Sequence, residues 1–258
     1  MNGTFKRSRK AAKRGKSSRA RSVQRARRGL RSYARYRTPT AIQGAQHLFP
    51  EKKLVTFGYN QRFLLDNALA TETATKVFRL SSLYDPDFDV SVTNGSHQPF
   101  MFDQMAVFYD KYCVMGAKVT ITAFARDTNV MNTSNIICAY FEDGSHTDYP
   151  TNPDALREKR YDGKKFAQLG STNNSNLHPK KLVLKYSAKK FFSVSSMKDN
   201  LTTHGATTTT NPIKNAFLYI HLLNMYDGLK NFDPSEVFVN VNIQYTALMF
   251  DRRTVAQS

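Results

Sequence analysis

The stretch HQPFMFDQMAVFYDKYCVMGAKVTITAFAR, residues 97–126, contains the change of hydrophobic period that decides the fold. In its first half the apolar residues Phe102, Met105, Phe108 and Tyr112 recur at close to 3.6-residue intervals. This spacing predicts a short helix or helical turn, and Asp103 stands where it could cap the first turn.

From Cys113 onward the period of the same stretch changes to two. Apolar residues alternate with lysine and threonine through residues 118–124, which predicts a long β-strand entered through Gly116. Four residues of the stretch lie on the expected packing faces and are predicted to be largely buried: Phe108, Tyr112, Val119 and Ile121.

Strand-like segments continue along the rest of the chain, at residues 54–65, 75–81, 136–142, 164–169, 181–194, 216–225 and 237–250. We expect a bulge at Gln61-Arg62, a break near Ser187-Ala188, a short helix at residues 154–160 and a loop at residues 202–210. Eight strands with long polar loops and no βαβ alternation predict an all-β antiparallel two-sheet sandwich. The pattern alone leaves immunoglobulin-like and other Greek-key sandwiches open.

Charge is distributed very unevenly along the 258 residues, whose net charge is +18. Residues 1–40 contain 15 Lys or Arg and no acidic residue, whereas the remainder contains 23 basic and 20 acidic residues, a net charge of +3. The sequence therefore predicts two parts, a basic arm at residues 1–40 and a folded domain at residues 41–258.

The arm is predicted to be unfolded alone, because its charges repel one another and it has few large apolar residues. A faint stripe at Val23, Ala26 and Leu30 would allow helix once phosphates neutralise the charge. Eleven of the 15 cations are arginine, whose planar fork suits phosphate. The predicted nucleic-acid-binding residues are Lys6, Arg7, Arg9, Lys10, Lys13, Arg14, Lys16, Arg19, Arg21, Arg25, Arg27, Arg28, Arg31, Tyr33, Arg35, Tyr36 and Arg37.

Two alternatives remain open for this arm, and nuclear import is a compatible second use of it. Tyr33 and Tyr36 either stack on unpaired bases or dock the arm against the domain. The arm as a whole could also be a solvated tail that only aids solubility. A cluster typical of nuclear-localisation signals lies within it, at Lys10, Lys13, Arg14 and Lys16.

Residues that would indicate an enzyme or a metal site are scattered. The histidines do not stand at metal-ligand spacing from one another or from cysteine, and Cys113 and Cys138 read as buried free thiols. His97-Gln98-Pro99 reads as a loop held by side-chain hydrogen bonds, and Asp85-Pro86-Asp87 as a turn. We therefore expect no enzymatic activity, no metal site and no cofactor.

Two further absences are expected from the hydropathy pattern. The first ten residues, MNGTFKRSRK, lack the apolar core of a secretory signal. Apolar runs stay well short of 18 residues, so we expect no membrane insertion.

Between Val77 and Phe124 the sequence resembles the capsid proteins of circular, Rep-encoding single-stranded DNA viruses, the circovirus-like group. The similarity is carried by the order and spacing of short motifs, and the basic amino terminus adds to it. These motifs are Phe78-Arg79, Leu83-Tyr84-Asp85-Pro86, His97-Gln98-Pro99, Phe102-Asp103-Gln104, Phe108-Tyr109, Tyr112-Cys113-Val114 and Gly116-Ala117-Lys118-Val119.

The resemblance implies an eight-stranded jelly roll that assembles as about sixty copies in a small icosahedral (T=1) shell. It implies a circular single-stranded DNA genome bound through the arm, and a location in the virion and, during assembly, in the host nucleus. A host nuclear-import receptor and a host-cell surface receptor are further partners that it allows.

Two other classes of function compete with this interpretation. A cellular nucleic-acid-binding protein of ribosomal type would carry a basic face on its folded domain, and a net charge of +3 argues against one. An enzyme with a basic targeting tail would need a clustered polar site, which the sequence does not indicate.

Overall fold

Nine β-strands in two antiparallel sheets form the part of the protein that the structure, a computed structural model, describes. The described residues are 50–66, 73–90, 96–125, 135–144, 153–169, 179–224 and 236–253. The strands are β1 (Lys53–Leu65), β2 (Thr73–Arg79), β3 (Tyr109–Ala125), β4 (Asn135–Asp143), β5 (Asp162–Gln168), β6 (Lys180–Ser187), β7 (Gly205–Thr207), β8 (Ala216–Asn224) and β9 (Val237–Arg252). Four short helices accompany them, α2 (Phe102–Ala106), α3 (Pro153–Glu158), α4 (Ala188–Phe191) and α5 (Leu201–His204).

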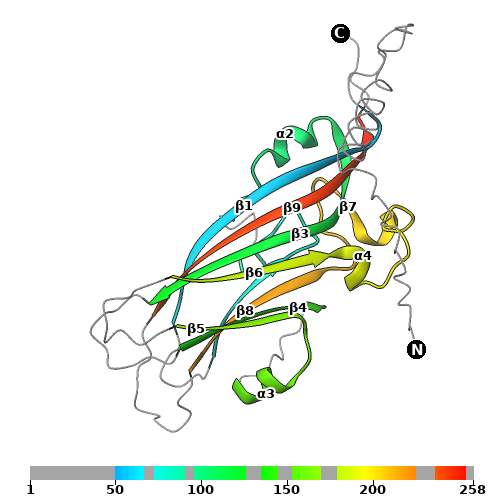
Figure 1. Ribbon diagram of the computed structural model, residues 1–258. Coiled ribbons are helices and arrows are strands. Elements are labelled where there is room, and N and C mark those ends of the chain that lie inside the picture. Colours follow the sequence, from blue (N-terminus) through cyan, green and yellow to red (C-terminus); the bar gives the residue numbers. More distant parts are fainter. Residues whose placement is uncertain are drawn as a thin grey trace, which may run out of the picture. The chain divides into compact units, whose positions relative to one another are not determined.

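Sheet 1 has the strand order β1-β9-β3-β6, with β7 also pairing with β3, and sheet 2 has the order β2-β8-β4-β5 (Figure 1). Every pairing is antiparallel, and the chain crosses between sheets from β1 to β2, β2 to β3, β3 to β4, β5 to β6, β7 to β8 and β8 to β9. Two four-stranded sheets wound in this way are the jelly-roll arrangement. The predicted all-β jelly-roll sandwich is confirmed, with β7 as a short addition.

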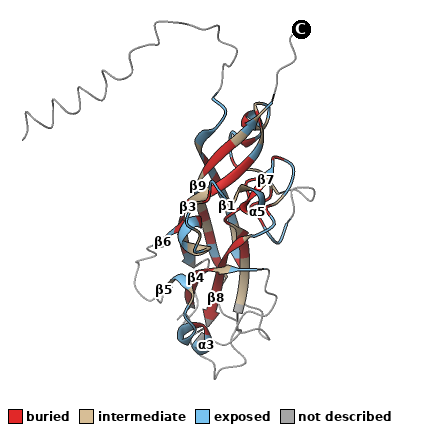
Figure 2. Ribbon diagram, turned by 90° about the vertical axis from the view of Figure 1, so that its right-hand side faces the viewer, coloured by how far each residue is buried: buried red, intermediate tan, exposed pale blue. Residues whose placement is uncertain are grey.

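The main hydrophobic core lies between the two sheets. Alternate residues of β1, β3 and β9 point into it, including Phe57, Tyr59, Ile121 and Val241. Figure 2 shows the buried residues running along the strands of both sheets, while helix α3 at the bottom is largely exposed.

Sheet 2 is covered on its outer face as well. Tyr140 and Tyr219 from β4 and β8 form a second, smaller core there with Leu156 of α3 and the partly buried Tyr161. The rings of Tyr140 and Tyr161 are stacked with centroids 3.8 Å apart. Both faces of sheet 2 are therefore apolar, whereas sheet 1 has only one apolar face.

The stretch at residues 97–126 contains the predicted helix and strand, but the boundary lies elsewhere. β3 begins at Tyr109, four residues before the predicted change at Cys113. Residues 109–112 pair with the end of β9, a long-range partner that the local period does not reveal. Asp103 lies in the first turn of α2 but makes no cap; the N-cap is Met101, with φ 69°.

Gly116 lies within β3, at a bulge between Val114 and Gly116, and not at the start of the strand as predicted. A Cβ atom at this position would lie 2.8 Å from the carbonyl oxygen of Tyr186 on β6, so only glycine fits there without a shift. Tyr112, Val119 and Ile121 are fully buried as predicted. Phe108 is less buried than these three residues: it is partly buried and packs against the core.

Several other boundaries differ from the predicted ones. β1 pairs with β9 without a register shift, so the bulge predicted at Gln61-Arg62 is absent. The segment at residues 181–194 is a strand to Ser187 and continues as helix α4 from Ala188, so the break predicted near Ser187-Ala188 is confirmed. The loop predicted at residues 202–210 contains the end of α5 and the whole of β7, because β7 finds a partner in β3.

The sequence predicts no secretory signal and no membrane insertion. The first ten residues, on which the first prediction depends, lie outside the described residues. In the described ranges the structure has no helix long and apolar enough to cross a membrane.

Candidate nucleic-acid interface

The predicted arm at residues 1–40 lies outside the described residues. It contains the predicted nucleic-acid-binding residues from Lys6 to Arg37 and the nuclear-localisation cluster at Lys10, Lys13, Arg14 and Lys16. These assignments therefore stay predictions. In the folded domain, the surface with the composition of a nucleic-acid interface is the outer face of sheet 1.

Strand alternation builds this face. Residues that point away from the core sit side by side in rows that run from β1 through β9 and β3 to β6. All of them are exposed or partly exposed. In order along the strands the rows are Thr56, Thr246, Gly116 and Ser187; Gly58, Gln244, Lys118 and Lys185; Asn60, Asn242, Thr120 and Val183; Arg62, Asn240, Thr122 and Lys181; and Leu64, Phe238 and Phe124.

The charged residues of this outer face are all basic: Arg62, Lys118, Lys181 and Lys185. None of them forms an ion pair with another described residue. Lys118 and Lys185 are direct cross-strand partners, an arrangement of like charges that destabilises a sheet. Most of the other residues in the first four rows carry amide or hydroxyl groups. Unpaired cations among such polar groups are typical of a surface that attracts anions.

The face is also sterically open around its second row. A Cβ atom added at Gly58 would have no described atom within 4 Å. The net charge of +3 outside the arm does not reveal this basic face. A net charge sums over all surfaces, whereas the sheet register gathers the cations on one of them.

Two acidic residues that follow β2, Asp85 and Asp87, form ion pairs with cations of that strand. Asp87 is fully buried and pairs with the ammonium group of Lys76 at 2.7 Å, while Asp85 pairs with the guanidinium group of Arg79 at 2.7 Å. Gln61 donates a hydrogen bond to Asp87 at 2.7 Å and accepts one from the hydroxyl of Tyr59 at 2.6 Å.

These contacts give the Asp85-Pro86-Asp87 segment a structural role beyond the predicted turn. Burial, with Asp87 nearby, raises the pKa of Tyr59 and keeps its hydroxyl protonated as a donor. Sequence reasoning missed the network, although Lys76 and Arg79, two cations in an otherwise apolar-patterned strand, were the available signal.

The His97-Gln98-Pro99 loop is held by side-chain hydrogen bonds, as predicted. The Nε2 atom of His97 lies 3.1 Å from the carbonyl oxygen of Asn60, and Gln98 donates to the carbonyl oxygen of Tyr84 at 3.0 Å. The His97 ring also stacks on Tyr59 with centroids 4.5 Å apart. The loop thus ties the connection before α2 to the edge strand β1.

Cys113 and Cys138 are buried free thiols, which confirms their predicted state. Burial raises the pKa of Cys113 to about 11 and that of Cys138 to about 12, so both stay protonated and unreactive near neutral pH.

His221 is a buried polar residue on the covered outer face of sheet 2. Its Nδ1 atom lies 2.8 Å from the hydroxyl of Thr75 and its Nε2 atom 3.0 Å from the hydroxyl of Tyr140. Burial lowers the pKa of His221 to about 3, so the ring is neutral. Its hydrogen bonds link β2, β4 and β8, which points to a structural role.

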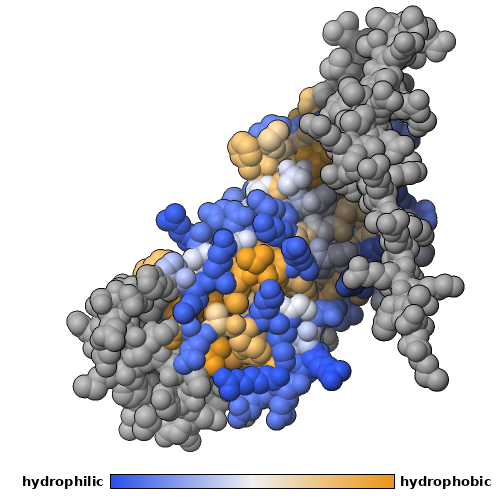
Figure 3. All heavy atoms as spheres, viewed as in Figure 1, coloured by the Kyte–Doolittle hydropathy of each residue, from blue (hydrophilic) through white to orange (hydrophobic). Residues whose placement is uncertain are grey.

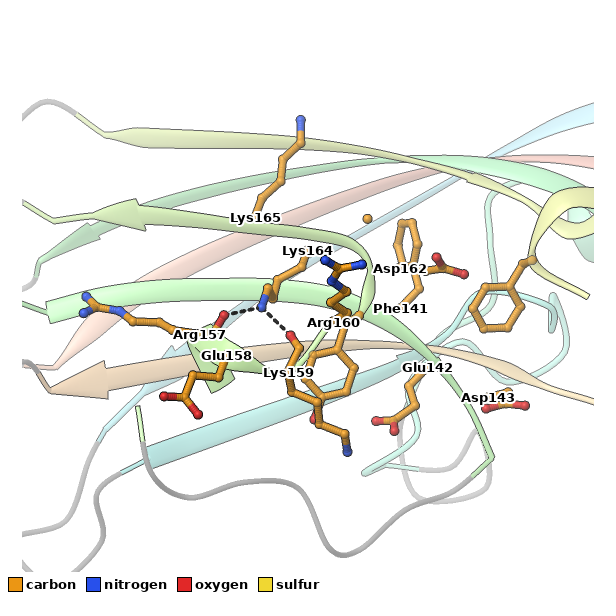
Figure 4. A pocket seen from close by; sticks show the side chains of 13 residues that line it. Phe141, Glu142, Asp143, Arg157, Glu158, Lys159, Arg160, Asp162, Lys164 and Lys165 are labelled. Carbon is orange, nitrogen blue, oxygen red and sulfur yellow. Dashed lines mark hydrogen bonds between the residues drawn. The ribbon is translucent and has the colours of Figure 1, made fainter. Parts of the chain in front are cut away.

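A hollow of about 1060 Å³ lies beside the connection from β4 to β5 (Figure 4). Its lining mixes Glu142, Asp143 and Asp162 with basic residues such as Arg157 and Arg160, so it favours neither sign of ligand charge. The ammonium group of Lys164 donates to the carbonyl oxygens of Arg157 and Lys159 and so closes the end of α3. Within the described ranges, groups of three or more His, Cys, Asp or Glu placed to hold a metal ion are absent.

Comparison with known proteins gives likenesses of shape only. No family model matches the chain. No curated protein matches its sequence. Among solved structures, the chain is similar to turnip yellow mosaic virus, with TM-score 0.41, 11% identity and coverage of 85% of this chain and 90% of that chain.

Two other solved structures give similar values. The 60-mer of the BFDV capsid protein has TM-score 0.44, 9% identity and coverage of 81% of this chain and 100% of that chain. Desmodium yellow mottle tymovirus has TM-score 0.35 and 12% identity, with 100% of both chains covered. All three TM-scores are below 0.5, so these likenesses carry no argument about function.

Proposed function

We propose that this protein is a viral capsid protein that assembles as about sixty copies into a small icosahedral (T=1) shell and packages circular single-stranded DNA. The observation that carries this proposal is the separation of charge along the chain. An acid-free stretch with 15 cations precedes a domain of net charge +3 whose sheets have jelly-roll order.

The charge of the arm has the magnitude that packaging requires. Sixty arms would bring together about 900 cations, which can offset on the order of a thousand phosphates. Arginines on a segment without a folded scaffold neutralise phosphates but do not hold base edges in place, so binding would be independent of sequence.

The folded domain suits assembly through side chains and loops, because the edges of its sheets are partly covered. The backbone N–H of Phe100 donates to the carbonyl of Gly58 on edge strand β1 at 2.9 Å. Residues 86–88 run along edge strand β2, with Phe88 donating to Val77 at 3.1 Å. Between the edges of β5 and β6, the ammonium group of Lys165 donates to the carbonyl of Val183 at 2.6 Å. Covered edges disfavour uncontrolled strand addition.

The proposed function also includes the locations and host partners that the sequence resemblance implies. The protein would be found in the virion and, during assembly, in the host nucleus. There the cluster Lys10, Lys13, Arg14 and Lys16 would bind a nuclear-import receptor. A host-cell surface receptor would bind the outside of the shell.

A cellular nucleic-acid-binding protein is the second candidate, favoured by the acid-free outer face of sheet 1. Such a protein would bind nucleic acid as a monomer or small oligomer, whereas a capsid protein would enclose it. Assembly therefore separates the two functions.

The test is expression of the full chain and its mixing with circular single-stranded DNA. Electron microscopy and sedimentation should show uniform small spheres, and the DNA inside them should resist nuclease. Soluble complexes without shells, with the DNA fully digested, would favour the cellular protein. Replacing Arg25, Arg27 and Arg28 with alanine should flatten the slope of log affinity against log salt by about two units for every single-stranded sequence alike.

A further inference from the structure

We propose that the outer face of sheet 1 is a second, folded binding surface for single-stranded nucleic acid, separate from the arm. On this surface Phe124, with Phe238 beside it, stacks on unpaired bases, and the row of Lys118 and Lys185 holds phosphates. The inference rests on the proposed function only for the identity of the nucleic acid as the packaged DNA.

The stacking site is the last row of the face. Phe124 and Phe238 are direct cross-strand partners whose ring centroids lie 5.5 Å apart at an angle of 30°. Their side chains are 42% and 37% exposed, and Leu64, the partner of Phe238 on β1, is 39% exposed. Large apolar side chains on the solvent side of a polar sheet face are not needed by the core, which lies on the opposite side of the same strands.

The phosphate site lies along the same strands. Lys118 precedes Phe124 by six residues on β3, which corresponds to about 20 Å of strand. Between them lie the hydroxyl and amide groups of Thr120, Thr122 and Asn242, with Arg62 at the β1 edge. These groups donate and accept hydrogen bonds with phosphates and with the edges of unpaired bases.

The composition of the face favours a single strand over a duplex. The bases of a duplex are already stacked on one another, whereas an aromatic ring on an open sheet can stack only on a base that has been left unpaired. Beyond the aromatic row, the exposed residue Asp66 follows the end of β1. Its carboxylate would repel phosphate and so limit the binding surface to the rows between Gly58 and Phe124.

The test uses the full chain and two probes, an oligothymidine of about 20 nucleotides and a duplex of the same length. Fluorescence anisotropy across a salt series should show that F124L/F238L lowers single-strand affinity about tenfold and leaves duplex affinity within about twofold. The variant K118Q/K185Q should flatten the single-strand salt slope by about 1.4 units.

Matched variants control for loss of an exposed ring or of two charges elsewhere. Phe166 is 36% exposed on β5 of sheet 2, and Lys198 and Lys214 are exposed on the connection between β6 and β8. F166L and K198Q/K214Q should leave the preference for single strands unchanged. Because an added side chain at Gly58 meets open space, Gly58→Glu and Gly58→Gln differ only in charge, and the Glu variant should bind the single strand more weakly at low salt alone.

Ultraviolet crosslinking of the oligothymidine, followed by peptide mapping, locates the contact directly. Crosslinks on the peptide containing Phe124 support the inference even if no shells form, so its success does not depend on the proposed function. Crosslinks confined to residues 1–40, or an unchanged preference in F124L/F238L, would overturn it. If F124L/F238L impairs assembly in sedimentation but leaves single-strand affinity intact, the aromatic row contacts a second copy of the chain and the inference is wrong.

Discussion

The outer faces of the two sheets differ: one is covered by further apolar residues, and the other is exposed to solvent. The outer face of sheet 2 is closed by α3 and Tyr161 over Tyr140, Tyr219 and neighbouring apolar residues. The outer face of sheet 1 is open, polar and basic. A sheet needs only one apolar face to form a sandwich, so the second face is free to be either a further core or a binding surface.

The residue patterns of the strands account for this difference. β4 and β8, with the sequences NIICAYFED and AFLYIHLLN, are nearly continuous apolar runs, as strands buried on both faces are. In β3 and β9 apolar residues alternate with Lys, Thr, Asn and Gln over the length that carries the open face. The contrast between the two faces can therefore be tested by mutation, starting with the largest effect.

Truncation of the covered face should be costly. Tyr140→Ala removes a fully buried ring and its hydrogen bond to His221, and we expect a loss of about 3–5 kcal/mol in the free energy of unfolding. Thr120→Ala on the open face should change it by less than about 0.5 kcal/mol. Urea unfolding of both variants measures the contrast, and similar losses would show that the face of sheet 1 is also covered.

The buried ion pair that borders sheet 2 should be almost as sensitive. Asp87→Ala leaves Lys76 without its nearest carboxylate in a site only 12% exposed, and we expect a loss of about 3 kcal/mol. The double variant Lys76→Met/Asp87→Leu should be more stable than Asp87→Ala, because it removes the buried ammonium group that Asp87→Ala leaves with only the partly exposed Asp89, 3.2 Å away, as its partner. Losses that simply add in a double-mutant cycle would contradict this coupling.

Acid should weaken the covered face through His221. Its pKa is about 3 in the folded protein and about 6.5 when unfolded, so the unfolded chain binds the extra proton first as pH falls. The free energy of unfolding is therefore unaffected by His221 above about pH 6.5 and falls as the pH decreases toward 3. The loss is about 2 kcal/mol between pH 7 and pH 5.

The variant His221→Gln isolates this effect from other titrating groups, including His204, whose pKa burial also lowers. It should be less stable than the original protein at pH 7, and the gap should narrow by pH 5. Urea unfolding at the two pH values provides the comparison. A gap that is constant with pH would show that His221 titrates normally.

Mutation of a cation on the open face should change the free energy of unfolding least, and should increase it. Lys185→Gln removes the like-charge pair with Lys118 and should stabilise the fold by about 0.5 kcal/mol at low salt, an effect that added salt diminishes. Thermal melts in low and high salt measure it. Destabilisation instead would mean that Lys185 makes a favourable contact within the fold.

The sequence by itself determined which segments are strands and which faces are apolar, because side-chain alternation is a local property. Val119 and Ile121 are buried, the β1 segment forms a strand, and α3 begins at Pro153, next to the predicted start at residue 154. The two cysteines were also read correctly as buried thiols, since they lie in apolar strands. The charge of the arm is likewise a property of sequence alone.

Only the tertiary structure decided which distant residues share a surface. The cross-strand pair of Lys118 and Lys185, 67 positions apart, depends on the β3–β6 register, and no local pattern encodes that register. The same holds for Asp87 with Lys76, for the early start of β3 against β9, and for β7, whose three residues form a strand only because β3 lies beside them. The physical reason is that backbone hydrogen bonds and ion pairs are formed with whichever groups the fold brings near. Alternation sets only which side of a strand each residue occupies.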